Sequence, residues 1–79
     1  MKVLFFARAR DLAGTGEIDL DVPAGGRVAD LRRTLTERLP KLAALLPHCA
    51  VAVNDEYAAD DVILRDGDRV ALLPPVSGG

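Results

Sequence analysis

The chain ends in Gly78-Gly79, and the terminal carboxylate of Gly79 is the best candidate for a reacting group in this sequence. A carboxylate resists nucleophiles until one of its oxygens becomes a leaving group, so this group would have to be activated before it could react. Because glycine has no Cβ, a diglycine can thread a narrow channel and adopt backbone angles closed to other residues. The pattern therefore indicates a tail that presents its carboxylate to the active site of another protein.

Residues 74–79 have the composition of a tethered arm. Pro74 and Pro75 hold φ near about −65° and lack an amide donor, so they stop the preceding strand and stiffen the base of the arm. Six extended residues reach roughly 20 Å, which would bring Gly79 into a recessed site. We expect a domain of residues 1–73 followed by a flexible tail of residues 74–79.

The other chemically capable residues have structural explanations. One histidine and one cysteine, His48-Cys49, fall short of the four ligands of a zinc site, and we interpret Cys49 as a buried core residue. Asp66-Gly67-Asp68 is typical of a turn, and Asp60-Asp61 of a solvated surface. Gly25-Gly26-Arg27 lacks the spacing and the lysine of a phosphate-binding loop. We therefore predict no active site, metal or bound cofactor in the chain itself.

Composition excludes several classes of protein. The 79 residues make one domain, and a 49% hydrophobic content is enough for a core. A net charge of −2 and three aromatic residues argue against nucleic-acid binding. The apolar run of residues 3–7 is far too short to span a membrane. A single cysteine forms no internal disulfide and fits a reducing compartment, so we expect a soluble, cytoplasmic protein.

Hydrophobic periodicity predicts the elements that must position the tail. Residues 3–7 and 17–22 read as two antiparallel strands joined through a turn at residues 14–16. Apolar residues spaced by three and four predict a helix from Val28 to Leu39, which Pro40 ends. One further helical turn is expected near residues 42–46.

The second half of the chain reads as strands again. Residues 50–53 and 69–73 are apolar strands, and residues 57–58 add a brief one. Residues 62–64 are expected to pack inward before the turn at residues 66–68. The order predicts an α+β protein of the β-grasp (ubiquitin-like) type. It has a mixed sheet of four to five strands, with the first and last strands parallel at its centre and one main helix on one face.

Strand alternation predicts which side chains remain outside the core. If Val3, Phe5 and Ala7 face the helix, Phe6 lies on the uncovered face of the sheet. By the same argument Val70 and Leu72 point inward, and Leu73 points outward beside the root of the tail. With Tyr57 as a third member, Phe6 and Leu73 would form an exposed apolar surface, which is typical of a protein interface.

Four segments together resemble one family: residues 3–8 (VLFFAR), 28–31 (VADL), 66–71 (DGDRVA) and 74–79 (PPVSGG). The chain is similar along its full length to the small subunits of molybdopterin synthase, which are ubiquitin-like sulfur carriers. The run from residue 66 to residue 79 is the most specific part of this resemblance.

The resemblance implies a definite chemistry. An adenylyltransferase similar to the ubiquitin-activating class uses ATP to adenylate the Gly79 carboxylate, and a sulfur donor protein converts the acyl-adenylate into a thiocarboxylate. The large synthase subunit, in a heterotetramer with the small one, receives Gly78 and the charged Gly79. There, sulfur enters cyclic pyranopterin monophosphate and forms the molybdopterin dithiolene. Partner binding is implied for Phe6, Tyr57, Leu73, Pro74, Pro75, Val76 and Ser77.

The sequence departs from this family's usual pattern at one point and leaves alternatives open. Arg27 stands where a helix N-cap is often Thr or Ser, so we expect Gly26 or water to satisfy the first helical N–H groups. The same tail would also suit a sulfur carrier for thiamine, cysteine or tRNA thiolation. A protein modifier that forms isopeptide bonds, and a plain binding domain, are further alternatives.

Overall fold

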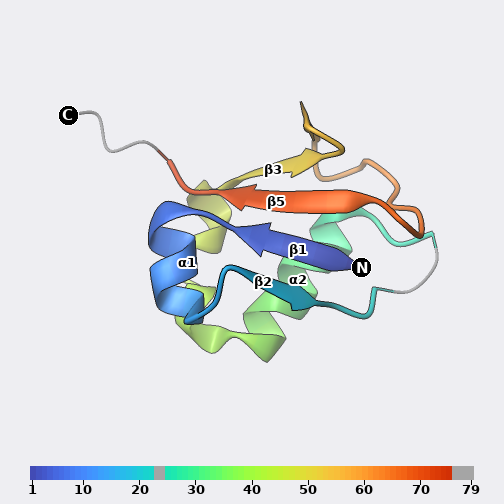
Figure 1. The fold of residues 1–79 in the computed structure, drawn as a ribbon. Helices are drawn as coiled ribbons and strands as arrows, with labels where there is room; N and C mark the ends of the chain where they lie inside the picture. The colour runs from blue at the N-terminus through green and yellow to red at the C-terminus, as the bar shows by residue number, and fades with distance from the viewer. Residues whose placement is uncertain (23–24, 76–79) are drawn as a thin grey trace.

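The computed structural model describes residues 1–22 and 25–75 (Figure 1). Five strands form one mixed sheet in the order β2-β1-β5-β3-β4. The elements are β1 (Lys2–Phe5), α1 (Ala7–Ala13), β2 (Glu17–Asp19), α2 (Val28–Arg38), the 3-10 turns η1 (Pro40–Leu42) and η2 (Leu46–His48), β3 (Ala50–Val53), β4 (Glu56–Tyr57) and β5 (Arg69–Leu73). Among the described residues, no helix has both the length and the apolar content needed to cross a membrane.

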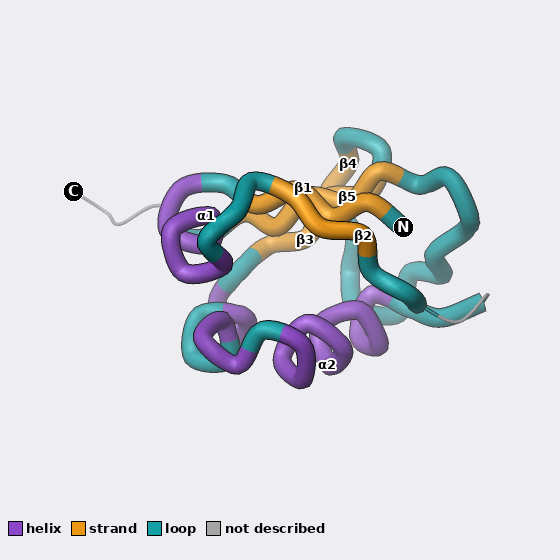
Figure 2. Tube along the Cα trace, turned by 60° about the horizontal axis from the view of Figure 1, so that its bottom comes forward, coloured by secondary structure: helices purple, strands orange, loops and turns teal. Residues whose placement is uncertain are grey.

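The first and last strands lie side by side, as predicted. β1 is parallel to β5, with Val3 opposite Val70 and Phe5 opposite Leu72, and β5 also pairs with β3 in antiparallel fashion. These four side chains are buried, because α2 covers the face of the sheet toward which they point (Figure 2). The predicted β-grasp arrangement is confirmed, with β5 hydrogen-bonded on both edges.

The main helix follows the predicted apolar stripe. Val28, Leu31 and Leu35 are fully buried against the sheet. The helix ends at Arg38, where the Leu39 N–H still donates to the Leu35 carbonyl at 2.8 Å. Pro40 prevents a further turn of α-helix. In place of the one helical turn expected near residues 42–46, the chain forms two separate 3-10 turns, η1 and η2, on either side of residues 43–45.

The start of α2 is capped differently from the sequence expectation. The Asp30 carboxylate accepts the Arg27 N–H at 2.8 Å, and this hydrogen bond lowers the pKa of the Asp30 carboxyl. The N–H groups of residues 28–29 donate to carbonyl oxygens of residues 60–62, at 3.0 Å each. The expectation that Gly26 or water would serve these groups was wrong, because a segment distant in sequence closes over the helix end.

A short helix, α1, replaces the expected end of the first strand. β1 stops at Phe5, and Ala7 is exposed rather than packed under α2. The chain turns at Ala7 with a positive φ of 50°, a conformation that its sequence does not announce. The helix ends at Gly14, whose φ of 76° is favourable for glycine. Ala9 is buried, so α1 adds a second helix to the core.

The segment before β5 packs inward at only one of three predicted positions. Leu64 is buried, whereas Val62 and Ile63 are 37% and 52% exposed. The Leu64 N–H donates to the Gly26 carbonyl at 2.8 Å, and the Val62 carbonyl faces the N-terminus of α2. These backbone bonds set the orientation of the segment and leave Val62 and Ile63 at the surface.

Candidate functional site

The residues predicted to surround the root of the tail come together in the structure. Phe6, Tyr57 and Leu73 line one shallow depression of about 310 Å³ on the face of the sheet that α2 does not cover. Phe6 is 46% exposed and Tyr57 is 80% exposed. We call this surface the docking patch; its remaining lining residues are Ala52, Asp55 and Ala71.

Strand register explains why these side chains meet. Phe5 pairs with Leu72 in the parallel ladder, so the next residues, Phe6 and Leu73, leave β1 and β5 at the same end of the sheet. Across β3, Ala52 is opposite both Ala71 of β5 and Tyr57 of β4. The small alanine side chains therefore form the floor of the depression, and the large side chains form its walls.

Sequence reasoning found the large members of the docking patch and missed the small ones. Alternation along β3 and β5 places Ala52 and Ala71 on the uncovered face. That they lie opposite each other could be known only from the order of the strands in the sheet. Asp55 is in the lining because the two-residue turn between β3 and β4 brings it back over the sheet.

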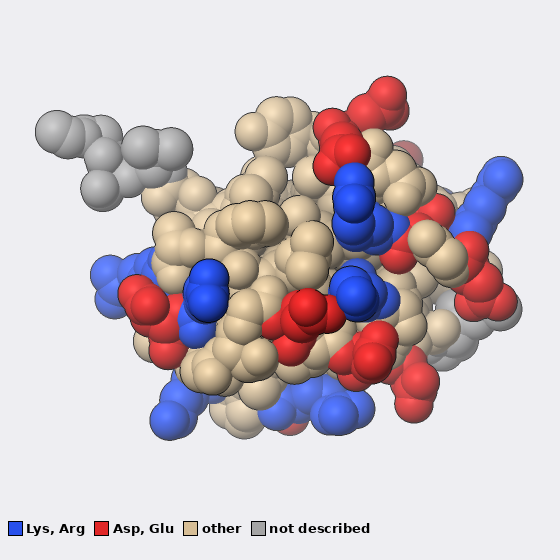
Figure 3. Space-filling model, in the orientation of Figure 1, with Lys and Arg blue, Asp and Glu red and all other residues tan. Residues whose placement is uncertain are grey.

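The uncovered face divides into an apolar end and a charged end. Lys2 pairs with Glu17 at 3.2 Å, and Arg69 pairs with Asp55 at 2.8 Å. Lys2 and Arg69 are neighbours in the ladder, at the start of β1 and β5, whereas Phe6 and Leu73 lie at the other end of these strands. Asp55 pairs with Arg69 and also lines the docking patch, so one carboxylate of the charged end reaches the patch. Figure 3 shows the same division, with a broad uncharged area over the end of the sheet where β5 finishes.

The tail begins directly at the docking patch. β5 ends at Leu73, a member of the patch, and Pro74 and Pro75 follow it. The structure describes the chain as far as Pro75, two residues beyond the end of β5. The candidate residues Val76, Ser77, Gly78 and Gly79 lie outside the described residues.

A network of hydrogen bonds holds the turn that carries Tyr57. Asn54 and Asp55 both have positive φ angles, 51° and 70°, as a tight hairpin turn requires. The Asn54 carbonyl oxygen Oδ1 accepts the Arg69 N–H at 3.0 Å, and the Asn54 amide donates to Asp68 at 2.9 Å. Asp68 also accepts the Arg65 N–H, and these two hydrogen bonds lower the pKa of the Asp68 carboxyl.

Cys49 and Asp60 make contacts within the fold. Cys49 is 4% exposed, and its Sγ donates to the Leu45 carbonyl at 3.3 Å. Burial raises the pKa of the Cys49 thiol, which keeps it protonated and unreactive. Asp60 pairs with Arg32 at 2.9 Å. Within residues 1–22 and 25–75, no cluster of three or more His, Cys, Asp or Glu side chains could hold a metal ion.

Comparison of the sequence with protein families gives one match that spans nearly all of the chain. The sequence model of the ThiS family matches residues 3–79. The molybdopterin synthase sulfur carrier subunit of Chlamydomonas reinhardtii is 38% identical over an alignment that covers 100% of this chain and 98% of that protein.

Two solved structures with the same fold are a small archaeal modifier protein and a subunit of a protein–protein complex. SAMP1 of Haloferax volcanii, a small archaeal modifier protein, superposes with a TM-score of 0.87 at 31% identity, and the match covers 99% of this chain and 97% of that one. The complex of subunits 1 and 2 of the molybdopterin-converting factor from Helicobacter pylori contains a chain with a TM-score of 0.72 and 32% identity. That match covers 99% of this chain and 96% of the other.

Proposed function

The chain belongs to the ThiS family, and we propose that within this family it is the sulfur carrier subunit of a molybdopterin synthase. The observation that carries the proposal is the full-length similarity to a protein of that name, at 38% identity. The docking patch supports it, because the base of the tail then lies against a surface suited to a partner protein.

The reacting group is the Gly79 carboxylate. An adenylyltransferase partner transfers AMP from ATP to this carboxylate and releases pyrophosphate. A sulfur donor protein then supplies sulfur at the oxidation level of sulfide. This sulfur attacks the acyl carbon, AMP leaves, and Gly79 ends in a thiocarboxylate. ATP belongs to the partner in this scheme, and the carrier itself binds no cofactor.

The large subunit uses the sulfur. It receives Gly78 and the charged Gly79 in its active site, where the thiocarboxylate sulfur bonds to a carbon of cyclic pyranopterin monophosphate. Water then cleaves the resulting thioester, so that the sulfur stays on the pterin and the free Gly79 carboxylate is regenerated. Because each tail carries one sulfur and a dithiolene needs two, each product consumes two charged carriers. The two kinds of subunit form a heterotetramer, and the reaction takes place in the cytoplasm.

The described residues have separate tasks in this scheme. Phe6, Tyr57 and Leu73 supply the apolar contact with the partner, and Pro74 and Pro75 limit the freedom of the tail where it leaves β5. A stiff base lowers the entropy cost of ordering the tail in a partner's active site. Val76 and Ser77 extend the reach to the diglycine.

A second candidate function is protein modification. The similarity to SAMP1, named a modifier, favours it as an alternative, since that protein covers nearly the whole chain at 31% identity. The same activated Gly79 carboxyl would then form an isopeptide bond with a lysine of the target protein. Both functions require adenylation, and they differ in the nucleophile that follows.

Intact-protein mass spectrometry distinguishes the two functions. We would co-express the chain with the adenylyltransferase and a sulfur source, and use a chain lacking Gly79 as the control. Exchange of one carboxyl oxygen for sulfur in the full chain, absent from the control, is the expected result. Heavier conjugates would favour the modifier, and an unchanged mass together with full activity of the control would overturn both. Reconstitution with the large subunit and the pterin precursor then tests the pathway.

A further inference from the structure

Most of the exposed large hydrophobic side chains of residues 1–22 and 25–75 lie at or beside the β4 edge of the sheet. There are four in all: Phe6, Tyr57, Val62 and Ile63. Phe6 and Tyr57 belong to the docking patch on the uncovered face. Val62 and Ile63 lie on the other side of β4, beside a second and larger hollow. The apolar surface is therefore not confined to the docking patch.

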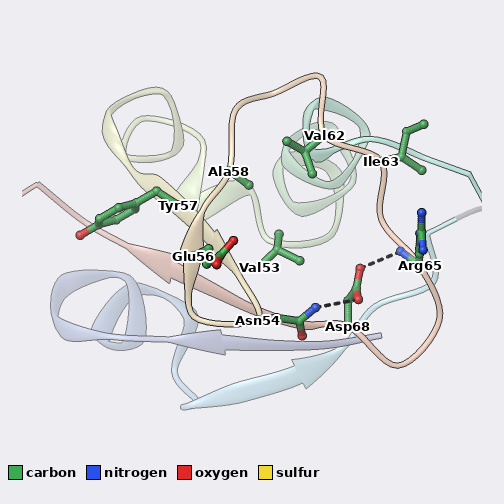
Figure 4. A pocket seen from close by; sticks show the side chains of 9 residues that line it. All are labelled: Val53, Asn54, Glu56, Tyr57, Ala58, Val62, Ile63, Arg65 and Asp68. Atoms are coloured by element: carbon green, nitrogen blue, oxygen red, sulfur yellow. Dashed lines mark hydrogen bonds between the residues drawn. The ribbon is translucent and has the colours of Figure 1, made fainter.

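The second hollow is a groove of about 510 Å³ between β4 and the segment that follows it (Figure 4). Val53, Ala58 and Val62 line its middle, while Glu56 and Arg65 lie toward opposite ends. The Tyr57 ring points away from this groove, as alternation along a strand requires. We call it the edge groove; its other lining residues are Asn54, Tyr57, Ile63 and Asp68.

Between the docking patch and the edge groove runs a free strand edge. β4 is an edge strand of the sheet, and β3 is its only neighbour. The Ala58 N–H donates to the Val51 carbonyl at 2.8 Å, which makes the intervening pair of Tyr57 and Ala52 a non-hydrogen-bonded pair. The Tyr57 N–H and C=O therefore point out of the sheet, and within the described part of the chain they form no hydrogen bond.

This arrangement fits an extended peptide segment. A strand added beside Tyr57 would make main-chain hydrogen bonds to its N–H and C=O. Its successive side chains would point alternately to the two faces of the sheet, one toward the docking patch and the next into the edge groove. A helix or a compact loop would contact one hollow or the other, but would leave the Tyr57 backbone groups without partners.

Charge identifies the kind of segment. Residues 54–68 contain six carboxylate side chains and one arginine, Arg65. Among the described residues, the carboxylates of Glu56, Asp61 and Asp66 form no salt bridge. This edge therefore attracts a segment with basic residues, and it repels a second copy of the same acidic edge.

We propose that the edge of β4 is a strand-addition site for an extended segment of a partner protein, in which apolar and basic residues alternate. The proposal rests on the proposed function, because the partner is the protein that docks on the patch and receives the tail. The partner would contact the docking patch and the β4 edge at the same time, so that its interface includes both faces of the sheet at this edge.

Two substitutions test the edge groove without touching the docking patch or the tail. Glu56→Lys reverses an exposed charge beside the groove, and Ile63→Asp places a charge on its apolar wall. Glu37→Lys, an exposed charge reversal on α2, is the matched control for the first. Binding of the full chain to the purified large subunit and to the purified adenylyltransferase would be measured by calorimetry, with thermal unfolding to confirm that each variant folds.

We expect each groove variant to bind at least one of the two proteins about tenfold more weakly, with the Glu56→Lys effect shrinking at high salt. In that complex, amide hydrogen exchange at Tyr57 should slow by about tenfold or more, as its N–H gains an acceptor. Glu37→Lys should bind like the parent chain.

Unchanged affinities for both proteins, with unchanged Tyr57 exchange, would overturn the strand-addition site. Self-association of the parent chain in gel filtration, lost in Ile63→Asp, would overturn it in favour of a second copy. Failure of the proposed function is seen separately, since the parent chain would then gain no sulfur by intact mass. If the parent bound neither protein, both proposals would fail.

Discussion

The Asn54 side-chain amide donates a hydrogen bond of 2.9 Å to the Asp68 carboxylate, and this contact joins the β3–β4 turn to the turn that precedes β5. The other carboxylate oxygen of Asp68 accepts the Arg65 N–H at 2.8 Å. Two turns, distant in the sequence, are thereby held by one ionised side chain. Tyr57 is carried by the first of them, so its position beside the docking patch depends on this pair.

Low pH should weaken the hydrogen bonds that Asp68 accepts from Arg65 and Asn54. Hydrogen bonds from Arg65 and Asn54 lower the pKa of Asp68 in the folded chain, so its ionised form stabilises the fold above the ordinary aspartate pKa. That contribution is lost as the pH falls below about 4 and through the lowered pKa. We expect Asp68→Asn to reduce the free energy of unfolding at pH 7 and to differ less from the parent at pH 2, as measured by urea denaturation. Equal differences at both pH values would contradict this.

Ala7→Gly should stabilise the fold. Ala7 has a φ of 50°, which costs an alanine about 1 kcal/mol or more and costs glycine almost nothing. Part of the gain is offset by the greater freedom of glycine in the unfolded chain, so we expect a net rise of about 0.5 kcal/mol in the free energy of unfolding. Ala9→Gly, at a buried position inside the same helix, is the control and should destabilise the fold. A loss of stability in Ala7→Gly would show that the positive φ is not strained.

Arg32→Met should destabilise the domain, because Arg32 joins α2 to segments distant in the sequence. The Arg32 guanidinium donates to the Leu46 and Cys49 carbonyls at 2.6 and 2.8 Å, and its Nε pairs with Asp60 at 2.9 Å. Loss of these partly buried charged hydrogen bonds should lower the free energy of unfolding by about 2–3 kcal/mol. Its exposed neighbour Arg33 is the control, and Arg33→Met should cost less than about 1 kcal/mol.

Phe6→Asp tests whether Phe6 serves the docking patch or the hydrophobic core. Phe6 is 46% exposed, so the variant should keep a thermal unfolding midpoint close to that of the parent. Its affinity for the large subunit should fall by about tenfold to a hundredfold, because an aromatic anchor is replaced by a charge. Phe5→Asp, at a residue 2% exposed, should unfold the domain instead. Unfolding of Phe6→Asp would assign this residue to the core.

Alternation and helical spacing predicted most of the architecture. The opposite environments of Phe5 and Phe6, and of Leu72 and Leu73, follow from a period of two, and the stripe from Val28 to Leu35 follows from a period near 3.6. These patterns report burial on the covered face of a sheet. They therefore located the large side chains of the docking patch correctly.

Features that depend on backbone geometry or on distant partners could not be predicted in this way. The positive φ of Ala7 ended β1 early, and the pattern of α1 was hidden because only Ala9 is fully buried in that helix. Capping of α2 by residues 60–62 could not be predicted without knowing where this loop, more than 30 residues away in the sequence, lies in the fold. The same hydrogen bonds leave Ile63 facing outward. The edge groove follows from this loop, so no local pattern predicted it.

The central place of β5 has a mechanical consequence. The tail continues from the strand that is hydrogen-bonded to β1 on one side and to β3 on the other. A protein that draws the Pro74 end toward itself while holding the domain pulls β5 along its own length, and the two ladders then resist as a shear joint. Under such a force along the strand, the hydrogen bonds of both ladders share the force and must break together. Hydrogen bonds of an edge strand pulled away sideways would break one after another. The domain can thus bear traction on its tail without unravelling.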